Sequence, residues 1–378
     1  MRTILNLFGL LAGSALLAAC GLRIPDPAPY VARCEAFARP APAETVGGLF
    51  FMTSRLPDCR GERLLFPGIR YAELHYGISD PAPDPSVSWD RPDSILLTQA
   101  DWEAALGRDL RAGGNRGRVL VYVHGYFNDF DDALQRAAIL RTQYGREVPT
   151  VVVSWPSRNR PQSYSYDEDT IEWAQDHLDG LLRRLAETSD DITLVGHSMG
   201  ARAVMRAVER LDLEDPASGR KVGRVVLASP DIDRDQMLRG NGTVARVLAR
   251  QPERKVLIYV SRRDLALRAS RDTHGYSRLG SSDCRYDVAY ARRSLADCHI
   301  AAPNERLAVV DTSAARAERG RLIRHNDFVK SCAVRADLRA FLRGQAPPAW
   351  RQPVTRPGED LIGYRIAPEL VDPAVCPQ

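Results

Sequence analysis

The most regular pattern in the chain is an alternation of short apolar runs with longer helical stretches between residues 118 and 345. The apolar runs end in polar or turn-forming residues and are short enough to predict β-strands. They read RVLVYVHGY, PTVVVSWPS, DITLVGHS, VGRVVLASP, RKVLIYVSRRD and ERLAVVDTS. Strands that are apolar throughout are typical of a parallel sheet covered by helices on both faces.

The segments between these strands have the spacing of amphipathic helices. DDALQRAAILRTQYG ends on Gly145, and HNDFVKSCAVRADLRAFLRG supplies a last helix. Two further helices each place apolar side chains on one face: Ile171, Ala174, Leu178, Leu181 and Leu185, then Ala201, Val204, Met205, Val208 and Leu211. The alternation predicts an α/β fold, a three-layer αβα domain around a mostly parallel central sheet.

The flanking segments differ in composition from this core. We expect five parts: a signal peptide at 1–19, a Pro/Ala-rich tether at 20–45, N-terminal strands at 46–117, the core at 118–345 and a Pro-rich tail at 346–378. Residues 46–345 would then form one domain. Its first part contains the strand-like runs VGGLFFMTSRL and IRYAELHYGIS and a Pro/Asp stretch, and the tail is predicted to pack as extended chain.

The N-terminus, MRTILNLFGLLAGSALLAAC, has one early Arg, an apolar run and small residues before Cys20. The run is too short to span a membrane and is typical of a secretory signal. LAAC resembles the lipobox of bacterial lipoproteins, in which Cys20 becomes the lipid-bearing first residue. Gly21 after this cysteine favours the outer membrane by the same resemblance. We therefore expect an exported bacterial lipoprotein on the periplasmic face of the outer membrane.

Six cysteines remain after Cys20, an even number that suggests disulfides in an exported chain. Six cysteines allow 15 pairings, so the sequence does not fix the connectivity. The closely spaced pairs Cys34/Cys59 and Cys284/Cys298 are the first expectation and leave Cys332/Cys376. No Cys/His spacing suits a metal ion.

The charge balance argues against nucleic-acid binding. The formal net charge is +4, and of 52 basic residues only Lys221, Lys255 and Lys330 are lysines, which leaves 49 arginines. The arginines form no basic block of five or six residues. No nucleic-acid partner is expected.

The strongest chemical motif is GHSMG, which lies between a predicted strand and a predicted helix. Gly196 and Gly200 permit a sharp turn that raises Ser198 above the carboxyl edge of the sheet. This nucleophile elbow also opens a helix N-terminus, where the Met199 N–H can stabilise an oxyanion. A serine that only forms a structural turn is the alternative.

A serine nucleophile needs a base and a carboxylate that orients the base. In this architecture the acid follows the serine in the sequence, and the histidine follows the acid. Asp264 lies just past the strand KVLIYV, and His325 follows the last core strand. Parallel strands bring both to the edge where Ser198 lies. Asp231 in ASPDID is the second candidate acid, and Asp311 is a third.

Other histidines remain as alternatives. His274 and His299 follow Asp264 and cannot be excluded by chain order alone. His197 adjoins Ser198 but is expected to point elsewhere, and we assign no role to His177 or His75.

The second oxyanion donor is expected after the first core strand. In YVHGYFNDF, His124 and Gly125 end the strand, and the backbone N–H of Tyr126 would pair with that of Met199. The alternative is that His124 and Gly125 form a turn that ends the strand and has no role in an oxyanion hole.

These segments, in this order, resemble the α/β-hydrolase superfamily over residues 45–345. More narrowly, they are similar to a bacterial family of α/β hydrolases of unknown function (DUF900-like). The resemblance maps the Ser, Asp and His of the family pattern onto Ser198, Asp264 and His325. It implies a serine hydrolase acting on esters and needing no metal or organic cofactor, whereas the Cys284–Cys298 insertion has no place in the pattern.

The sequence thus predicts a lipid-anchored serine ester hydrolase whose substrate is a small-molecule or lipid ester. An acyltransferase that passes the acyl group to an envelope acceptor shares the first half-reaction and remains an alternative. A non-catalytic binding protein on the same fold is the alternative of another class.

Overall fold

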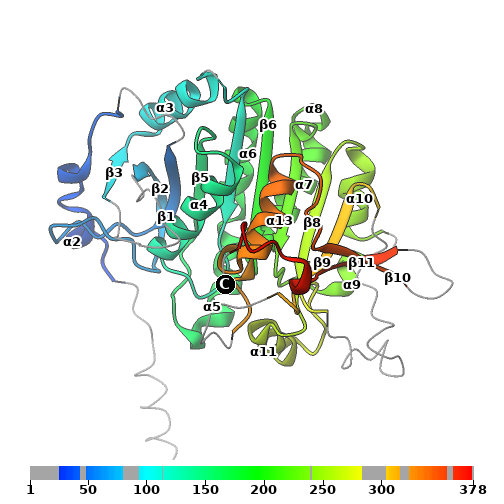
Figure 1. Ribbon diagram of the computed structural model, residues 1–378. Coiled ribbons are helices and arrows are strands. Elements are labelled where there is room, and N and C mark those ends of the chain that lie inside the picture. Colours follow the sequence, from blue (N-terminus) through cyan, green and yellow to red (C-terminus); the bar gives the residue numbers. More distant parts are fainter. Residues whose placement is uncertain are drawn as a thin grey trace, which may run out of the picture.

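The computed structural model describes eight segments of the 378-residue chain (Figure 1). They are residues 25–42, 48–79, 93–112, 114–238, 241–282, 304–315, 323–355 and 361–376. The predicted signal peptide, Cys20 and the Cys284/Cys298 pair lie outside the described residues. Within these segments, every helix is too short or too polar to cross a membrane.

One sheet runs through the described part of the chain in the order β10-β11-β9-β8-β7-β6-β4-β5-β1-β2-β3. Its strands are β1 (Leu49–Arg55), β2 (Arg70–Ser79), β3 (Ser94–Leu97), β4 (Arg118–Val123), β5 (Thr150–Ser154), β6 (Asp191–His197), β7 (Val222–Ala228), β8 (Lys255–Val260), β9 (Leu307–Asp311), β10 (Arg351–Thr355) and β11 (Leu361–Ile366). The six strands predicted for the core are β4 to β9. They pair in parallel, as do β1 with β5 and β11 with β9. The remaining strands β2, β3 and β10 pair antiparallel near the two edges of the sheet.

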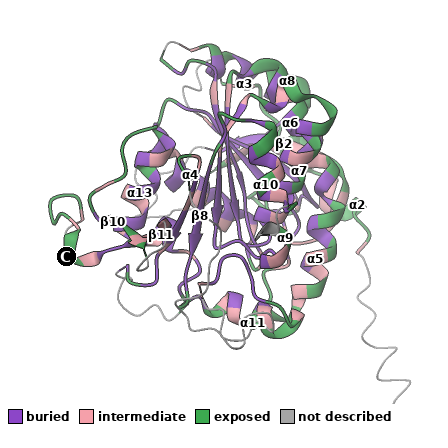
Figure 2. Ribbon diagram, turned by 90° about the vertical axis from the view of Figure 1, so that its right-hand side faces the viewer, coloured by how far each residue is buried: buried purple, intermediate pink, exposed green. Residues whose placement is uncertain are grey.

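Helices cover both faces of the sheet, as the apolar strands predicted. The longer ones are α3 (Gln99–Arg111), α4 (Phe130–Tyr144), α5 (Tyr164–Trp173), α6 (Gln175–Thr188), α7 (Gly200–Glu214), α10 (Thr243–Arg250), α11 (Leu265–His274) and α13 (Cys332–Leu342). The shorter ones are α2 (Ala28–Val31), α8 (Pro216–Gly219), α9 (Arg234–Leu238), α12 (Asp327–Lys330) and the 3-10 turns η1 (Cys34–Phe37), η2 (Pro161–Ser163) and η4 (Pro368–Leu370). Figure 2 shows the buried sheet between two helical layers.

The alternating side chains of β4 explain why helices are needed on both faces of the sheet. Val119 and Val121 pack in one apolar cluster with α3, α6, α7 and α10, whereas Leu120 and Tyr122 pack in a second cluster with α4, α12 and α13. All four are fully buried. Successive side chains of a strand point to opposite faces, so an apolar strand requires cover on both. The predicted three-layer αβα fold is confirmed.

The predicted apolar helix faces lie in the core. Their ten residues, Ile171 to Leu185 in α5 and α6 and Ala201 to Leu211 in α7, are each no more than 6% exposed. The first of the two predicted helices is divided at Ala174, which ends α5 and precedes α6.

The predicted tether differs in part from the structure. Residues 25–42 contain α2 and η1, and a disulfide joins Cys34 to Cys59. The Cys59 N–H donates to the Tyr30 carbonyl at 2.9 Å, and Ala38 forms a bridge with Leu96. Covalent and backbone contacts therefore hold residues 25–42 on the domain, although their Pro/Ala content indicated a tether.

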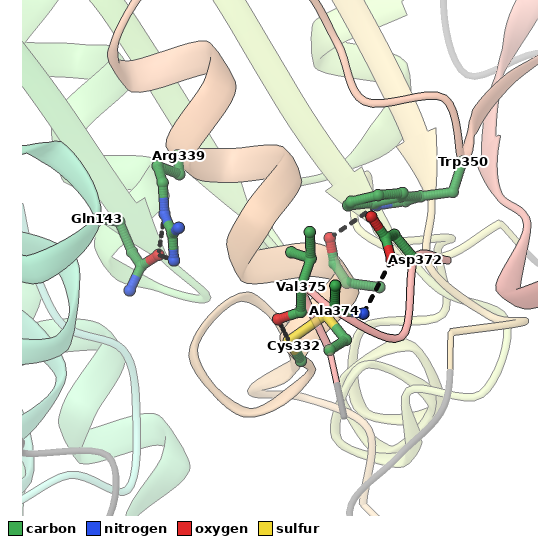
Figure 3. Close-up of a disulfide and its surroundings, with 9 residues drawn as sticks. Gln143, Cys332, Arg339, Trp350, Asp372, Ala374 and Val375 are labelled. Carbon is green, nitrogen blue, oxygen red and sulfur yellow. Dashed lines mark hydrogen bonds between the residues drawn. A yellow bond between two sulfur atoms is a disulfide. The ribbon is translucent and has the colours of Figure 1, made fainter. Parts of the chain in front are cut away.

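The predicted tail joins the sheet. After α13, β10 and β11 form an antiparallel pair, and β11 extends the sheet beside β9. A disulfide between Cys332 and Cys376 ties the end of the described chain to the start of α13 (Figure 3). Two of the expected cysteine pairs, Cys34/Cys59 and Cys332/Cys376, are thus confirmed.

Candidate active site

The turn after β6 holds Ser198 in a strained conformation. β6 ends at His197, Ser198 has a φ of 54°, and α7 begins at Gly200. A positive φ is uncommon for a residue with a Cβ and often occurs at functional turns. The Ser198 N–H donates to the Ala228 carbonyl at 3.0 Å, and the Ser198 carbonyl accepts from the Asp231 N–H at 3.1 Å. The loop after β7 therefore stabilises the strained residue.

The two glycines of the motif are required by close backbone approaches. A Cβ at Gly196 would lie 2.7 Å from the Ala201 Cα, and one at Gly200 would lie 2.4 Å from the Val123 carbonyl oxygen. Real Cβ atoms do not approach backbone this closely, so only glycine fits at either position without moving a strand or helix.

Asp264 and His325 form a buried hydrogen-bonded pair. The Asp264 side chain caps α11 by accepting from the Leu267 N–H at 3.0 Å through Oδ1. Its Oδ2 accepts from His325 Nδ1 at 2.7 Å. His325 Nε2 has no hydrogen-bond partner within the described segments, so it is the ring nitrogen left to accept a proton. Asp264, His325 and Ser198 are all at least nine-tenths buried.

His197 connects the elbow to the loop of His325. Its Nε2 lies 3.0 Å from the His325 carbonyl oxygen, and the two rings are 4.7 Å apart. Burial and the neighbouring His325 hold the pKa of His197 well below its ordinary value. The neutral ring can therefore donate through Nε2 to the His325 carbonyl and tie the loop of His325 to the residue that precedes Ser198. From the sequence, His197 was expected to point elsewhere, and this role was not predicted.

The pKa of His325 is raised by its partner. Burial disfavours the imidazolium, but the Asp264 charge and its hydrogen bond outweigh burial, so the pKa lies above 6.5. The carboxylate fixes the tautomer that leaves Nε2 unprotonated and stabilises the ring once it gains a proton.

Asp231, the second candidate acid, has other partners. It accepts hydrogen bonds from Ser270 Oγ and Arg278 Nε, both at 2.6 Å, and from the Tyr164 hydroxyl. Arg202 also donates to it at 3.1 Å. Burial disfavours its charge, but Arg278 and Arg202 outweigh burial and lower the pKa of Asp231. The structure brings Asp264 to His325 and holds Asp231 in an arginine network.

A cleft of about 300 Å³ lies beside this network. It is lined by Arg202, Arg278, Glu168, His274 and Tyr276, among others. Glu168 pairs with Arg202 at 2.7 Å and with His274 Nε2 at 2.8 Å. His274, which chain order left as a candidate base, is therefore hydrogen-bonded to Glu168 of this network.

The remaining alternatives are placed elsewhere or are not described. Asp311 accepts from the Ser313 N–H at 2.7 Å, a local turn contact at the end of β9. His177 packs edge-on against Trp173, and His75 lies in β2. His299 lies outside the described residues.

The loop after β4 lies directly against Ser198. A Cβ at Gly125 would be 2.5 Å from the Ser198 Cβ, so this glycine also permits a close approach. The Gly125 carbonyl accepts from Asn128 Nδ2 at 3.2 Å, and His124 Nδ1 lies 2.9 Å from it. Because N–H and C=O point in opposite directions across a trans peptide, this leaves the Tyr126 N–H on the other side. Neither that N–H nor the Met199 N–H has an acceptor in the described part of the chain.

Asn128 and Arg55 form a support for this loop that the sequence analysis missed. Asn128 Nδ2 also donates to the Tyr126 carbonyl at 2.6 Å. Fully buried Arg55 donates to the carbonyls of Asn128 at 2.9 Å and Ser157 at 3.0 Å. Burial lowers the pKa of Arg55 to about 10, so it stays charged at neutral pH. Asn128, three residues past Gly125, was open to prediction as a turn residue, but Arg55 comes from a distant strand and gave no signal.

Comparison with known proteins agrees with this architecture. Residues 98–342 match the family described as alpha/beta hydrolase of unknown function (DUF900). The match spans more than half of the chain, so the protein belongs to this family of hydrolases. No curated protein sequence matches the chain.

Solved structures to which the chain is similar include several esterases and a lipase. An esterase of Pyrobaculum calidifontis is 14% identical, with 61% of this chain and 76% of that chain covered and a TM-score of 0.34. A Rhizomucor miehei esterase is 12% identical (72% and 80% covered, TM-score 0.36), and a Paleococcus ferrophilus monoacylglycerol lipase is 15% identical (61% and 93% covered, TM-score 0.33). The assignment of the family stands on the family match, not on these distant likenesses.

Proposed function

We propose that this chain is a serine hydrolase that cleaves carboxylic esters through a Ser198–His325–Asp264 triad. The observation that carries the proposal is the 2.7 Å hydrogen bond from His325 Nδ1 to buried Asp264, and the positive φ of Ser198 in the turn after β6 supports it. A serine, a histidine and an orienting carboxylate in this relationship provide nucleophile, base and support.

In this mechanism His325 Nε2 takes the Ser198 proton as Oγ attacks the ester carbonyl carbon. The tetrahedral oxyanion accepts hydrogen bonds from the backbone N–H groups of Met199 and Tyr126. Collapse of the intermediate breaks the ester bond, and His325 returns the proton to the leaving alcohol. Water, deprotonated by His325, then attacks the acyl-enzyme and releases the acid and Ser198.

Acyl transfer to an envelope acceptor is the second candidate, because an alcohol can replace water in the last step. A panel of 4-nitrophenyl esters of increasing acyl length, run with and without an added alcohol, separates the two. Hydrolysis predicts one equivalent of free acid for each nitrophenol released. A Ser198→Ala variant with the same rate as the wild-type chain, or no turnover of any ester, would contradict the proposal of a serine esterase.

We also propose that Cys20 carries a lipid that anchors the protein at the periplasmic face of the outer membrane. The lipobox-like LAAC sequence supports this proposal. Cys20→Ser should move the protein from the outer-membrane fraction, and unchanged retention there would contradict the anchor. Two or more acyl chains are needed for stable attachment of this kind.

A further inference from the structure

A second cleft, of about 390 Å³, lies between the end of α4 and α13, and its charged lining is made of arginines. These are Arg146, Arg335, Arg339 and Arg343. Among the described residues that line it there is no Asp or Glu. Arg343 contacts the Gln143 and Tyr144 carbonyls, just before β5 begins. The cleft therefore extends toward the amino edge of the sheet, whereas Ser198 lies at the carboxyl edge.

Three of these arginines repel one another. Arg335 and Arg339 lie in α13, and Arg343 follows its last residue; their spacing of four residues places them on one face of the helix. Like charges at this spacing destabilise a helix. Burial, followed by the charges of Arg343 and Arg335, lowers the pKa of Arg339. The protein maintains this cluster at an electrostatic cost.

Neutral acceptors orient two of the guanidinium groups without cancelling their charge. Arg339 donates through Nε and one terminal nitrogen to Gln143 Oε1, both at 3.0 Å (Figure 3). Arg343 Nε donates to the Gln143 carbonyl at 2.9 Å. The Arg335 guanidinium has neither a carboxylate nor another acceptor within the described segments.

Several exposed arginines elsewhere in the protein pair with carboxylates. Arg183 pairs with Glu214 at 2.7 Å, although both side chains are 47% exposed, and Arg60 pairs with Asp58 at 2.8 Å. The cleft on α13 differs from these pairs, because four arginines line one space and the described residues that line it include no Asp or Glu.

We propose that this cleft binds a phosphate group, either of a soluble ligand or of a lipid headgroup. A phosphate monoester carries a charge of about −1.5 to −2 and three acceptor oxygens, and the planar guanidinium fork matches its oxygens. Several guanidinium groups can donate to different oxygens of one such anion, whereas a single carboxylate offers only two oxygens. The proposal is independent of the proposed esterase activity.

The test measures binding of inorganic pyrophosphate to the full chain by calorimetry, and sedimentation with phosphatidylcholine vesicles with or without phosphatidic acid. Arg335→Gln removes a charge without breaking a hydrogen bond of the described structure, so it should fold. It should weaken binding about tenfold, the effect expected for one lost charge-assisted contact. The triple variant R335Q/R339Q/R343Q should abolish binding, and higher salt should weaken it in the wild-type chain.

The matched control, R60Q/R183Q/R365Q, removes three arginines that are about half exposed and paired with carboxylates. It should bind like the wild-type chain. If the wild-type chain binds pyrophosphate and Arg335→Gln weakens this binding, the site takes a soluble phosphate. If only the vesicles that contain phosphatidic acid bind the chain, the site takes a lipid headgroup. No binding in either arm, or equal loss in the control and triple variants, would overturn the proposal.

Discussion

His325 Nδ1 and Asp264 Oδ2 lie 2.7 Å apart, while Asp231 binds two arginines. Asp231 follows β7, and Asp264 follows the neighbouring strand β8. Chain order alone therefore did not decide which of the two is the acid of the triad. The partners separate them: only Asp264 contacts the imidazole, and Asp231 neutralises the buried charge of Arg278. The two residues should therefore respond differently to the same substitution.

Asp264→Asn should lower kcat for a 4-nitrophenyl ester by roughly 10³- to 10⁴-fold, because an amide no longer fixes the required His325 tautomer. Asp231→Asn should instead destabilise the fold by about 3–5 kcal/mol, because it leaves buried arginine charge uncompensated. Rates and denaturant unfolding of both variants provide the check. If Asp231→Asn lowered kcat more than Asp264→Asn does, Asp231 would be the acid of the triad.

The pH dependence of kcat/KM follows from the raised pKa of His325. Only the neutral imidazole can accept the Ser198 proton, so activity should fall as the pH drops through that pKa. The acid limb of the profile should therefore lie above the ordinary histidine value of 6.5. In Asp264→Asn, no carboxylate at this position offsets the effect of burial, so the pKa of His325 should fall. The acid limb of the residual activity should therefore move to lower pH. A limb at the same pH in both proteins would refute this role for Asp264.

Asn128→Leu should lower kcat roughly tenfold to a hundredfold with little change in KM. Leucine has a similar volume but donates no hydrogen bond to the carbonyls of Gly125 and Tyr126, so the peptide that presents the Tyr126 N–H loses its support. The effect should stay below the roughly 10²- to 10³-fold cost of removing an oxyanion donor outright. Steady-state kinetics at a temperature where both proteins are folded measure it. An unchanged kcat would show that Asn128 does not position this loop.

The core of the fold could be predicted because its information is local. Apolar strands, helical periodicity and GHSMG are visible within short segments, and parallel topology brings their carboxyl ends together. The helix α3 was missed, although Thr98 caps it by accepting from the Asp101 N–H, because the strand that precedes it, SILL, has only four residues. The docking of residues 25–42 depends on Cys59, which is distant in sequence.

Only the individual residues of the candidate site could be predicted from the sequence, not the side chains that support them. Ser198, Asp264 and His325 follow from strand ends and chain order, but their supports come from side chains that meet only in three dimensions. Arg55 reaches the loop of Asn128 from β1, and His197 bonds to a residue more than a hundred positions later. No local pattern distinguishes such residues from ordinary buried ones.

The central claim is that Ser198 is an activated nucleophile. The most direct measurement is labelling of the full chain by a fluorophosphonate probe, followed by mass spectrometry of the modified peptide. Attack by Oγ on phosphorus, with loss of fluoride, should label the peptide containing Ser198 in the wild-type chain, and Ser198→Ala should not be labelled. Equal labelling of Ser198→Ala, or no labelling of the folded wild-type chain, would contradict the account.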